Sequence, residues 1–239
     1  MKNTLKTKVL KGARLAVALF AGAAFCEVSY GSLTDTRDGK TYKTVRIGTQ
    51  TWMAKNLNYE TDESYCYKDD PANCREYGRL YTWAAAMDSA AVFSEGGKGC
   101  GYGRRCTPTN PVRGVCPDGW HLPSVAEWNT LEEFVAGSFL SGKTDSVGYA
   151  LKSRFGWKEN YNRKPGNGSD SFGFRALPAG GRFGDGSFDS VREGAGFWSA
   201  TETGANYAYY RYLYYDFTDL NTDDNVKDWA LSVRCVKDS

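Results

Sequence analysis

Histidine is almost absent from this chain of 239 residues, which contains one, and long apolar runs are absent after residue 25. A zinc centre of the Cys/His type needs several cysteines and histidines at short spacing, and a single histidine cannot complete that set. A membrane-spanning helix needs about 20 consecutive apolar residues, which no later segment supplies. The sequence therefore predicts neither a zinc centre nor a transmembrane segment, and it contains no internal repeat.

The first 24 residues have the pattern of a signal peptide. Five basic residues precede an apolar run over residues 15–25, and Gly22-Ala23-Ala24 offers a cleavage site of small residues. We therefore expect a protein that is secreted or displayed at the cell surface. A lipid anchor on Cys26 is the alternative, but Phe25 before it fits a lipobox poorly, because that position takes a small residue.

No excess charge of one sign remains once the leader is removed. The chain after residue 24 has 25 Lys and Arg residues against 28 Asp and Glu residues, a net charge of −3. Nucleic-acid binding needs a concentrated basic face, so we expect no nucleic-acid partner.

The remaining chain, about 210 residues, is long enough for one domain with a sizeable core. It is rich in glycine and aromatic residues, which is typical of short strands joined by long loops. We expect residues 25–36 to be a mobile lead-in and residues 37–239 to form a single domain.

Six cysteines other than Cys26 form an even set, which in an exported protein indicates disulfides. Six cysteines allow 15 pairings. Proximity in the sequence favours the pairs Cys66–Cys74 and Cys100–Cys106, which leaves Cys116–Cys235 as the third pair. The last pair closes the longest loop and would stabilise the fold by about 4–5 kcal/mol on the chain-entropy model.

The first half of the domain shows patterns of short strands and two helices. Residues 41–47 and 51–53 predict a hairpin, and residues 79–88 have helical spacing. A second helix is predicted over residues 124–136, where Ser124 and Glu127 make a capping box. Between them, residues 93–115 are rich in glycine and proline and predict a loop held by a disulfide.

The second half of the domain is predicted to be mainly strands. Residues 172–177 and 196–201 each read as a strand, and residues 184–187 as a hairpin turn. We expect residues 207–217 and 228–236 to close the domain as a strand pair.

Several segments resemble the Fibrobacter succinogenes major paralogous domain family. The likeness is carried, in chain order, by residues 38–42, 47–59, 66–67, 74, 77–83, 116–128, 172–180, 197–202 and 232–236. The resemblance implies an α+β, C-type-lectin-like fold, in which two helices flank small twisted antiparallel sheets with long disulfide-pinned loops. It also implies a distant likeness to formylglycine-generating enzymes.

The segment from Tyr207 to Phe217 is unusually rich in tyrosine. As a strand it would place Tyr210, Tyr212 and Tyr214 on one face and Tyr207, Tyr209, Arg211, Leu213 and Tyr215 on the other. Tyrosines on a solvated face offer flat stacking area and a hydroxyl, which suits a sugar or a protein partner. The predicted ligand-binding residues are therefore Tyr207, Tyr209, Tyr210, Tyr212, Tyr214 and Trp198. Cross-strand packing that only stabilises the sheet is the alternative.

Two further groups are weaker candidates. Asp219, Asp223 and Asp224 lie in an acidic stretch that could bind Ca²⁺, although a solvated turn is the simpler interpretation and no other cofactor is indicated. His121 has no nearby nucleophile or second metal ligand, so we expect a packed histidine bonded to backbone. Glu202 reads as a capping or ion-pairing residue.

These patterns favour a non-catalytic binding or adhesion module that contacts a polysaccharide or a surface protein through aromatic residues. A formylglycine-generating-type oxidoreductase is one alternative, but that chemistry uses cysteine thiols, and the expected disulfides leave no thiol pair. A purely structural component of the cell envelope is the other alternative.

Overall fold

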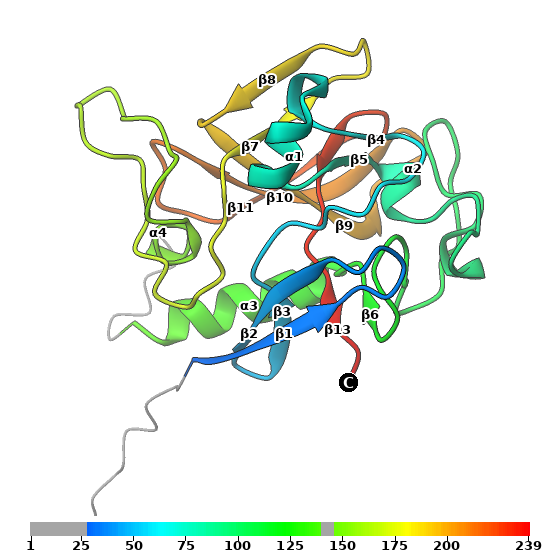
Figure 1. The fold of residues 1–239 in the computed structure, drawn as a ribbon, viewed down its shortest axis with the longest axis horizontal. Coiled ribbons are helices and arrows are strands. Elements are labelled where there is room, and N and C mark those ends of the chain that lie inside the picture. The colour runs from blue at the N-terminus through cyan, green and yellow to red at the C-terminus, as the bar shows by residue number, and fades with distance from the viewer. Residues whose placement is uncertain (1–27, 140–145) are drawn as a thin grey trace, which may run out of the picture.

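The computed structural model describes residues 28–139 and 146–239 (Figure 1). The predicted signal peptide and the alternative anchor at Cys26 lie outside these residues. None of the described helices has the length and apolar character needed to cross a bilayer. The described chain is an α+β fold, with strands in two sheets and short helices around them.

The strands are β1 (Ser29–Thr34), β2 (Thr41–Ile47), β3 (Gln50–Met53), β4 (Ser64–Tyr65), β5 (Leu80–Thr82), β6 (Trp120–His121), β7 (Ala179–Arg182), β8 (Phe188–Val191), β9 (Gly194–Glu202), β10 (Tyr207–Tyr214), β11 (Asn221–Val226), β12 (Ala230–Ser232) and β13 (Val236–Lys237). The helices are α1 (Pro71–Tyr77), α2 (Trp83–Ala86), α3 (Val125–Gly137) and α4 (Val147–Leu151), with 3-10 turns η1 (Tyr67–Asp69) and η2 (Glu95–Gly97).

The first sheet joins the beginning and the end of the domain. Its strand order is β1-β2-β3-β13-β6, so the last strand lies between the predicted hairpin and the short strand of the 116–128 corner. The hairpin of β2 and β3 is confirmed. The lead-in prediction is wrong over Ser29–Thr34, because this segment pairs along its whole length with β2.

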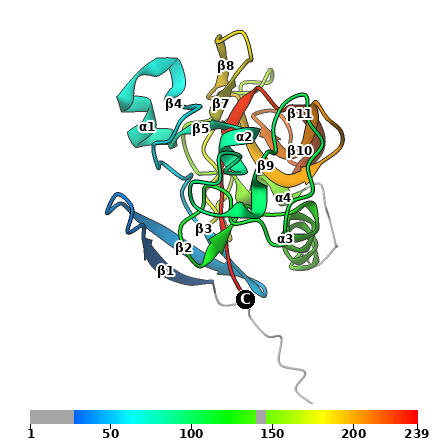
Figure 2. The ribbon, with the colours of Figure 1, turned by 90° about the vertical axis from the view of Figure 1, so that its right-hand side faces the viewer.

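The second sheet has the order β11-β10-β9-β7-β12-β5-β4, with β8 paired to β7. It is mixed, since β9 runs parallel to both β7 and β12. Figures 1 and 2 show it above the first sheet, with α3 running along one side. The hairpin turn at residues 184–187 is confirmed between β7 and β8.

Three predicted elements differ from the structure. Residues 79–88 divide into β5 and α2, because Thr82 ends the strand and its hydroxyl accepts from Ala85 to cap the helix. Residues 172–177 form no strand, since Arg175 has a φ of 55° and interrupts the extended chain. The segments 207–217 and 228–236 do not pair with each other, because β11 takes the edge of β10 while β12 pairs with β5, β7 and β9.

Helix α3 connects the two sheets through one aromatic core. Its capping box is confirmed, with Ser124 accepting from the Glu127 backbone while the Glu127 carboxylate accepts from Ser124. The buried face of the helix carries Trp128, whose ring lies 4.6 Å from that of Trp52 in β3 and 5.7 Å from that of Phe197 in β9. Burial of such large rings dominates the energetics of a core, so α3 holds the two sheets together.

The three predicted disulfides are confirmed as Cys66–Cys74, Cys100–Cys106 and Cys116–Cys235. The last one joins the 116–128 corner to the residue before β13. The first two lie in the loop-rich segments around α1 and after α2, where little regular structure holds the chain.

A buried arginine that the sequence did not single out also organises the fold. The side chain of Arg234 donates to the amide oxygen of Asn56 at 2.6 Å and to backbone carbonyls of Met53, Phe174 and Arg175. Burial lowers the pKa of this guanidinium, and the negative charge of Asp170 opposes that shift. Arg234 therefore holds the irregular segment around Phe174 in place through hydrogen bonds to its backbone carbonyls.

Candidate functional site

Strand β10 sends alternate side chains to two different environments. Arg211 and Leu213 are buried on the face that meets the helices, whereas Tyr210, Tyr212 and Tyr214 are half-buried on the opposite face. The predicted alternation of tyrosines is therefore confirmed for these three residues.

An ion pair fixes the helical side of β10. Nη1 of Arg211 donates to Oε2 of Glu132 in α3 at 2.8 Å, and Nη2 donates to the side chain of Asn129. Burial lowers the pKa of Arg211, and the negative charge of Glu132 opposes this shift. These contacts attach β10 to α3, so the opposite face of β10, which carries the tyrosines, has a fixed position.

Glycines form the floor beside the tyrosines. In the β9–β10 register Tyr212 lies opposite Gly196 and Tyr214 opposite Gly194, and β7 adds Gly180 and Gly181. Missing side chains in a strand allow another group to approach the backbone closely. A Cβ on Gly196 would lie 3.1 Å from Leu231 Cδ2 and 3.5 Å from Tyr210 Cδ2. The tyrosine rings can therefore lie low against the sheet.

The floor and the rings enclose a hollow of about 260 Å³. We call it the tyrosine groove and define it by Tyr210, Tyr212, Tyr214, Phe183 and Trp229. The rings of Tyr210 and Tyr212 stack with centroids 5.4 Å apart and planes inclined by 22°. Phe183 and Trp229 meet edge to face at 4.3 Å. The groove thus offers flat aromatic faces above a floor of backbone.

Polar groups are few in the tyrosine groove and lie at its rim. Asp189, Ser190 and Asn225 also line the hollow, and the hydroxyl of Tyr214 donates to Oε2 of Glu193 at 3.0 Å. Burial, together with nearby carboxylates, raises the pKa of Tyr210 and of Tyr214 to about 12. Both phenols therefore stay protonated at neutral pH and can donate a hydrogen bond.

Apolar rings with a few convergent polar groups are the usual composition of a site for a small molecule or a sugar. The groove lies within the part of the chain that comparison with known proteins identifies. A family model described as the Fibrobacter succinogenes major domain matches residues 45–237. The chain belongs to this family. No curated protein and no solved structure matches the chain.

The structure separates the six predicted ligand-binding residues of this family member into two groups. Tyr210, Tyr212 and Tyr214 line the groove, whereas Tyr207 and Tyr209 do not. The prediction for Trp198 is wrong, since its side chain is 0% exposed and its indole N–H donates to the carbonyl of Tyr81 at 2.8 Å. Trp198 lies opposite Tyr210 in the register, but it belongs to a core cluster that includes Tyr81 and Trp83, which bury it.

Sequence reasoning missed two aromatic residues and the glycines of the groove. Phe183 and Trp229 follow β7 and β11 and reach the site only through the strand order. The alternation of Gly194 and Gly196 within a strand was a usable signal, because glycine in a strand marks a close approach.

The calcium prediction is not supported by the geometry. Asp223 and Asp224 are neighbours in β11, where successive side chains point to opposite faces. Asp224 also accepts a hydrogen bond from Thr203 at 2.9 Å. Within residues 28–139 and 146–239 no group of three or more His, Cys, Asp or Glu side chains could hold a metal ion. The predicted solvated turn is in fact an edge strand over much of its length.

His121 is packed as predicted, but its partners are carboxylates rather than backbone. Nδ1 lies 2.7 Å from Oδ1 of Asp238, and Nε2 lies 2.6 Å from Oε1 of Glu127. Burial would lower the pKa of the imidazole, but the two carboxylates outweigh it and raise the pKa above 6.5. The histidine is an electrostatic bridge between the helix start and the end of the chain.

Glu202, which the sequence left between capping and pairing, forms an ion pair. Nζ of Lys227 lies 2.6 Å from its carboxylate and 4.3 Å from the centroid of the Trp83 ring. The backbone N–H of Cys106 donates to the same carboxylate at 3.3 Å. Glu202 thereby attaches the disulfide loop to the second sheet.

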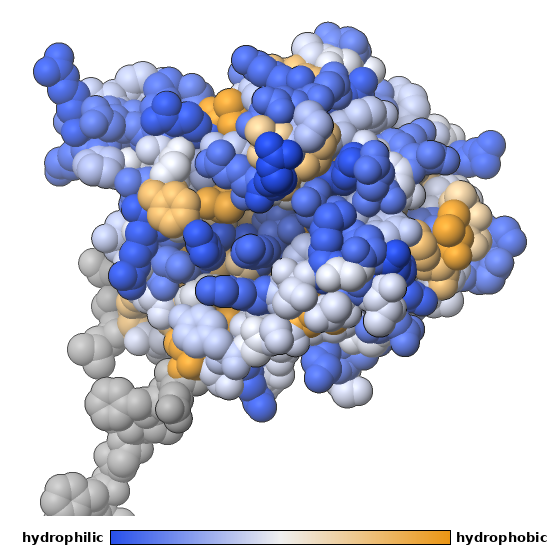
Figure 3. All heavy atoms as spheres, viewed as in Figure 1, coloured by the Kyte–Doolittle hydropathy of each residue, from blue (hydrophilic) through white to orange (hydrophobic). Residues whose placement is uncertain are grey.

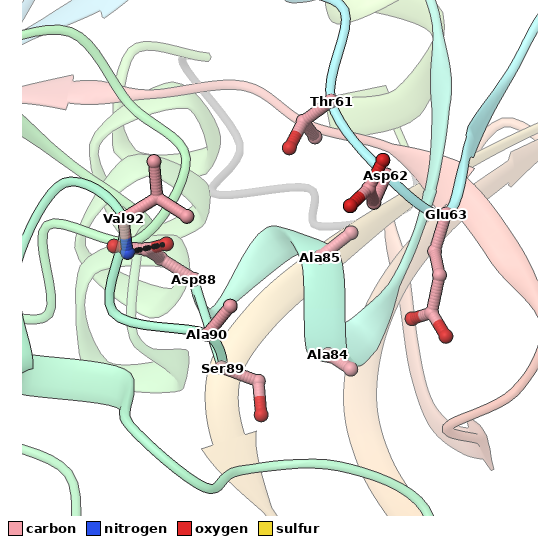
Figure 4. Close-up of a pocket in the computed structure, with 9 residues that line it drawn as sticks. All are labelled: Thr61, Asp62, Glu63, Ala84, Ala85, Asp88, Ser89, Ala90 and Val92. Carbon is pink, nitrogen blue, oxygen red and sulfur yellow. Dashed lines mark hydrogen bonds between the residues drawn. The ribbon is translucent and has the colours of Figure 1, made fainter.

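Asp62, Glu63 and Asp88 line another hollow, which lies beside α2 (Figure 4). The carboxylates of Asp62, Glu63 and Asp88 point apart there. Asp88 accepts from the backbone N–H groups of the three residues from Val92 to Ser94, and Glu63 accepts from the Thr82 hydroxyl. Asp88 and Glu63 therefore organise the local loops, and the three carboxylates do not converge on a common point.

Proposed function

We propose that this domain is a non-catalytic binding module that holds a polysaccharide in the tyrosine groove. The observation that carries the proposal is the juxtaposition of Tyr210, Tyr212 and Tyr214 with a floor of glycine backbone. A pyranose ring has one flat apolar face and a rim of hydroxyls. Stacked tyrosines meet the first, and protonated phenols with the polar residues at the rim meet the second.

A binding role is also supported by the state of the cysteines. All six described cysteines are paired in disulfides, so the described chain has no thiol pair for chemistry of the formylglycine-generating type. The fixed backing of β10 by Arg211 suits a preorganised binding surface, because a rigid site loses little entropy on binding.

Secretion and adhesion belong to the same proposal. Three disulfides persist in oxidising compartments, and the leader-like sequence of residues 1–24 agrees with export. We also include a C-type-lectin-like arrangement in the proposal, with support from the short sheets and the long disulfide-bridged loop after α2.

Pull-down on insoluble polysaccharides tests the proposal. Microcrystalline cellulose, xylan and mannan are incubated with the wild-type protein and with Tyr212→Ala and Trp229→Ala. We expect at least one polysaccharide to retain the wild-type protein, and both substitutions to weaken that binding about tenfold or more, as for central aromatic residues of an interface.

Tyr207→Ala is the matched control. Tyr207 belongs to the same strand and is 46% exposed, but it does not line the groove. Its loss should leave binding unchanged. Failure of all three polysaccharides to retain the wild-type protein, or equal weakening by all three substitutions, would overturn the proposal.

A further inference from the structure

Two other hollows meet on the face of the molecule that Figure 3 shows. One, of about 400 Å³, lies between α1 and the start of β2, and the other, of about 700 Å³, lies along β1 and β2. They share Thr41 and Arg175 in their linings, so they adjoin each other, and we treat the two together as one groove. Figure 3 shows this face as mainly hydrophilic, with apolar residues in small groups.

Positive charge dominates this groove. We call it the cationic groove and define it by Lys43, Lys55, Arg75 and Arg175, which line one or both hollows. None of the four takes part in an ion pair within residues 28–139 and 146–239. Lys40 also lines it, but its ammonium group is paired with Asp38 at 2.7 Å.

Two acidic residues line the groove and do little to cancel this charge. Asp170 accepts from the backbone N–H of Arg175 at 2.7 Å and interacts with the buried charge of Arg234. Its charge thus balances an arginine inside the fold. Glu76 is engaged with Tyr77, because burial and then a hydrogen bond and the charge of Glu76 raise the pKa of the Tyr77 phenol to about 12. Four cations therefore face one acidic residue not engaged with the buried arginine.

Arg175, at the junction of the two hollows, is held in a strained backbone conformation. Its φ of 55° lies in the left-handed region, which costs energy for a residue with a side chain. Asp170 fixes its N–H and Arg234 fixes its carbonyl at 2.9 Å. Its guanidinium lies 5.0 Å from the centroid of the Phe155 ring. The fold thus sets this guanidinium at the groove surface against an aromatic ring.

Exposed aromatic side chains flank the cations. Phe155 is 49% exposed in the first hollow, and Tyr30 is 66% exposed in the second. Rings this exposed gain little from the core, and they provide stacking surface for a planar or ring-shaped ligand. Guanidinium groups bind carboxylates and sulfates through paired hydrogen bonds.

We propose that the cationic groove binds an acidic polysaccharide, whose carboxylate or sulfate groups pair with Arg75, Arg175 and the two lysines while its rings contact Phe155 and Tyr30. This site is separate from the tyrosine groove and does not depend on its function. Single-stranded nucleic acid has similar chemistry, but three disulfides place the protein in an oxidising compartment, where a polysaccharide is the more accessible polyanion.

Affinity gel electrophoresis tests this proposal with the full mature protein. Separate gels contain polygalacturonate, heparin or neutral xylan, and the dissociation constant follows from the retardation of the protein. We expect retardation by polygalacturonate if the groove selects carboxylates, or by heparin if it selects sulfates. Arg75→Gln combined with Arg175→Gln should weaken binding tenfold or more. Raising the salt concentration from about 50 to 200 mM should weaken wild-type binding, because the Debye length shortens.

Arg105→Gln is the matched control, since Arg105 is exposed outside the groove and its loss should change nothing. Tyr212→Ala should also bind acidic polysaccharides normally, so failure here is distinguishable from failure of the tyrosine groove. The proposal is overturned if neither acidic polysaccharide retards the protein, if Arg105→Gln weakens binding as much as the double variant, or if an oligo-dT strand competes with an affinity equal to that of the best polysaccharide. Circular dichroism and thermal unfolding confirm that each variant folds.

Discussion

The two faces of β10 carry residues of similar size but differ in what surrounds them. On one face Leu213 and Arg211 are covered by helices, and a Cβ placed on Gly148 of α4 would lie 2.8 Å from Leu213 Cδ2. On the other face three tyrosines remain half-buried, and two of them, Tyr212 and Tyr214, lie opposite glycines. The core face is thus built to hold the sheet on α3 and α4, and the groove face is built to keep aromatic surface available.

The tyrosines on the groove face have a second explanation, which is structural. Aromatic rings over glycine are also a device that stabilises sheets, so the tyrosines could serve stability alone. Stability and binding separate the two explanations, because a core residue and a ligand residue respond differently to truncation.

Leu213→Ala should give the largest loss of stability. We expect the free energy of unfolding to fall by about 3–4 kcal/mol, since truncation of a buried leucine removes apolar contacts and leaves a cavity. Tyr212→Ala should cost about 1 kcal/mol or less, as for a cross-strand pair at the surface of a sheet. Urea denaturation followed by tryptophan fluorescence measures both. Equal losses would show that the groove face is structural.

Arg211→Ala should give the next largest effect. Removal of one partner from a buried ion pair leaves the other without its compensating charge, which costs about 3–5 kcal/mol when both are buried. Glu132 is 25% exposed in its side chain, so water compensates part of the loss and we expect about 2–3 kcal/mol.

Glu132→Gln is the reciprocal variant: it keeps a hydrogen-bonding group but leaves the charge of Arg211, whose side chain is 3% exposed, without its counter-charge, so it should destabilise the protein by a comparable amount. If Arg211→Ala were neutral in the same denaturation experiment, the ion pair would not fix the back of the strand, and the groove would lose its rigid support.

Patterns with a local cause were predictable from the sequence. The capping box of α3, the β2–β3 hairpin and the alternation of the tyrosines depend on neighbours within a few residues. Two of the three disulfides followed from proximity, and the third remained by elimination.

Features that depend on strand order were not predictable. Trp198 looked like a ligand residue because a strand pattern does not reveal which distant residues, here Tyr81 and Trp83, pack against its side chain. Phe183 and Trp229 come together only because β7 and β12 lie side by side. The left-handed backbone of Arg175, which ends the predicted 172–177 strand, depends on Asp170 and Arg234 and has no local signature.

The smallest predicted effect is a pH dependence of stability that arises at His121. This residue lies just before α3, the helix that supports the core face of β10. The imidazole of His121 binds carboxylates through both nitrogens, and its pKa in the folded protein lies above 6.5. A raised pKa means that protonation favours the folded state. The stabilisation is complete below about pH 6.5 and is lost as the pH rises through the folded pKa. Glu127, whose pKa is lowered from 4.5 because its bonds to His121 and Ser124 outweigh burial, loses its contribution as the pH falls through its own folded value.

Urea denaturation of the wild-type protein and of His121→Asn between pH 6 and pH 9 measures this effect. The difference in stability between the two should shrink as the pH rises, because only the wild-type protein loses a charged bridge. Lys152, whose pKa burial lowers to about 8, adds an opposite slope, but it is common to both proteins and cancels in the difference. A constant difference across the range would mean that His121 stabilises the corner by packing alone. Binding in the tyrosine groove should not change over the same range, because the pKa values of the Tyr210 and Tyr214 phenols are about 12.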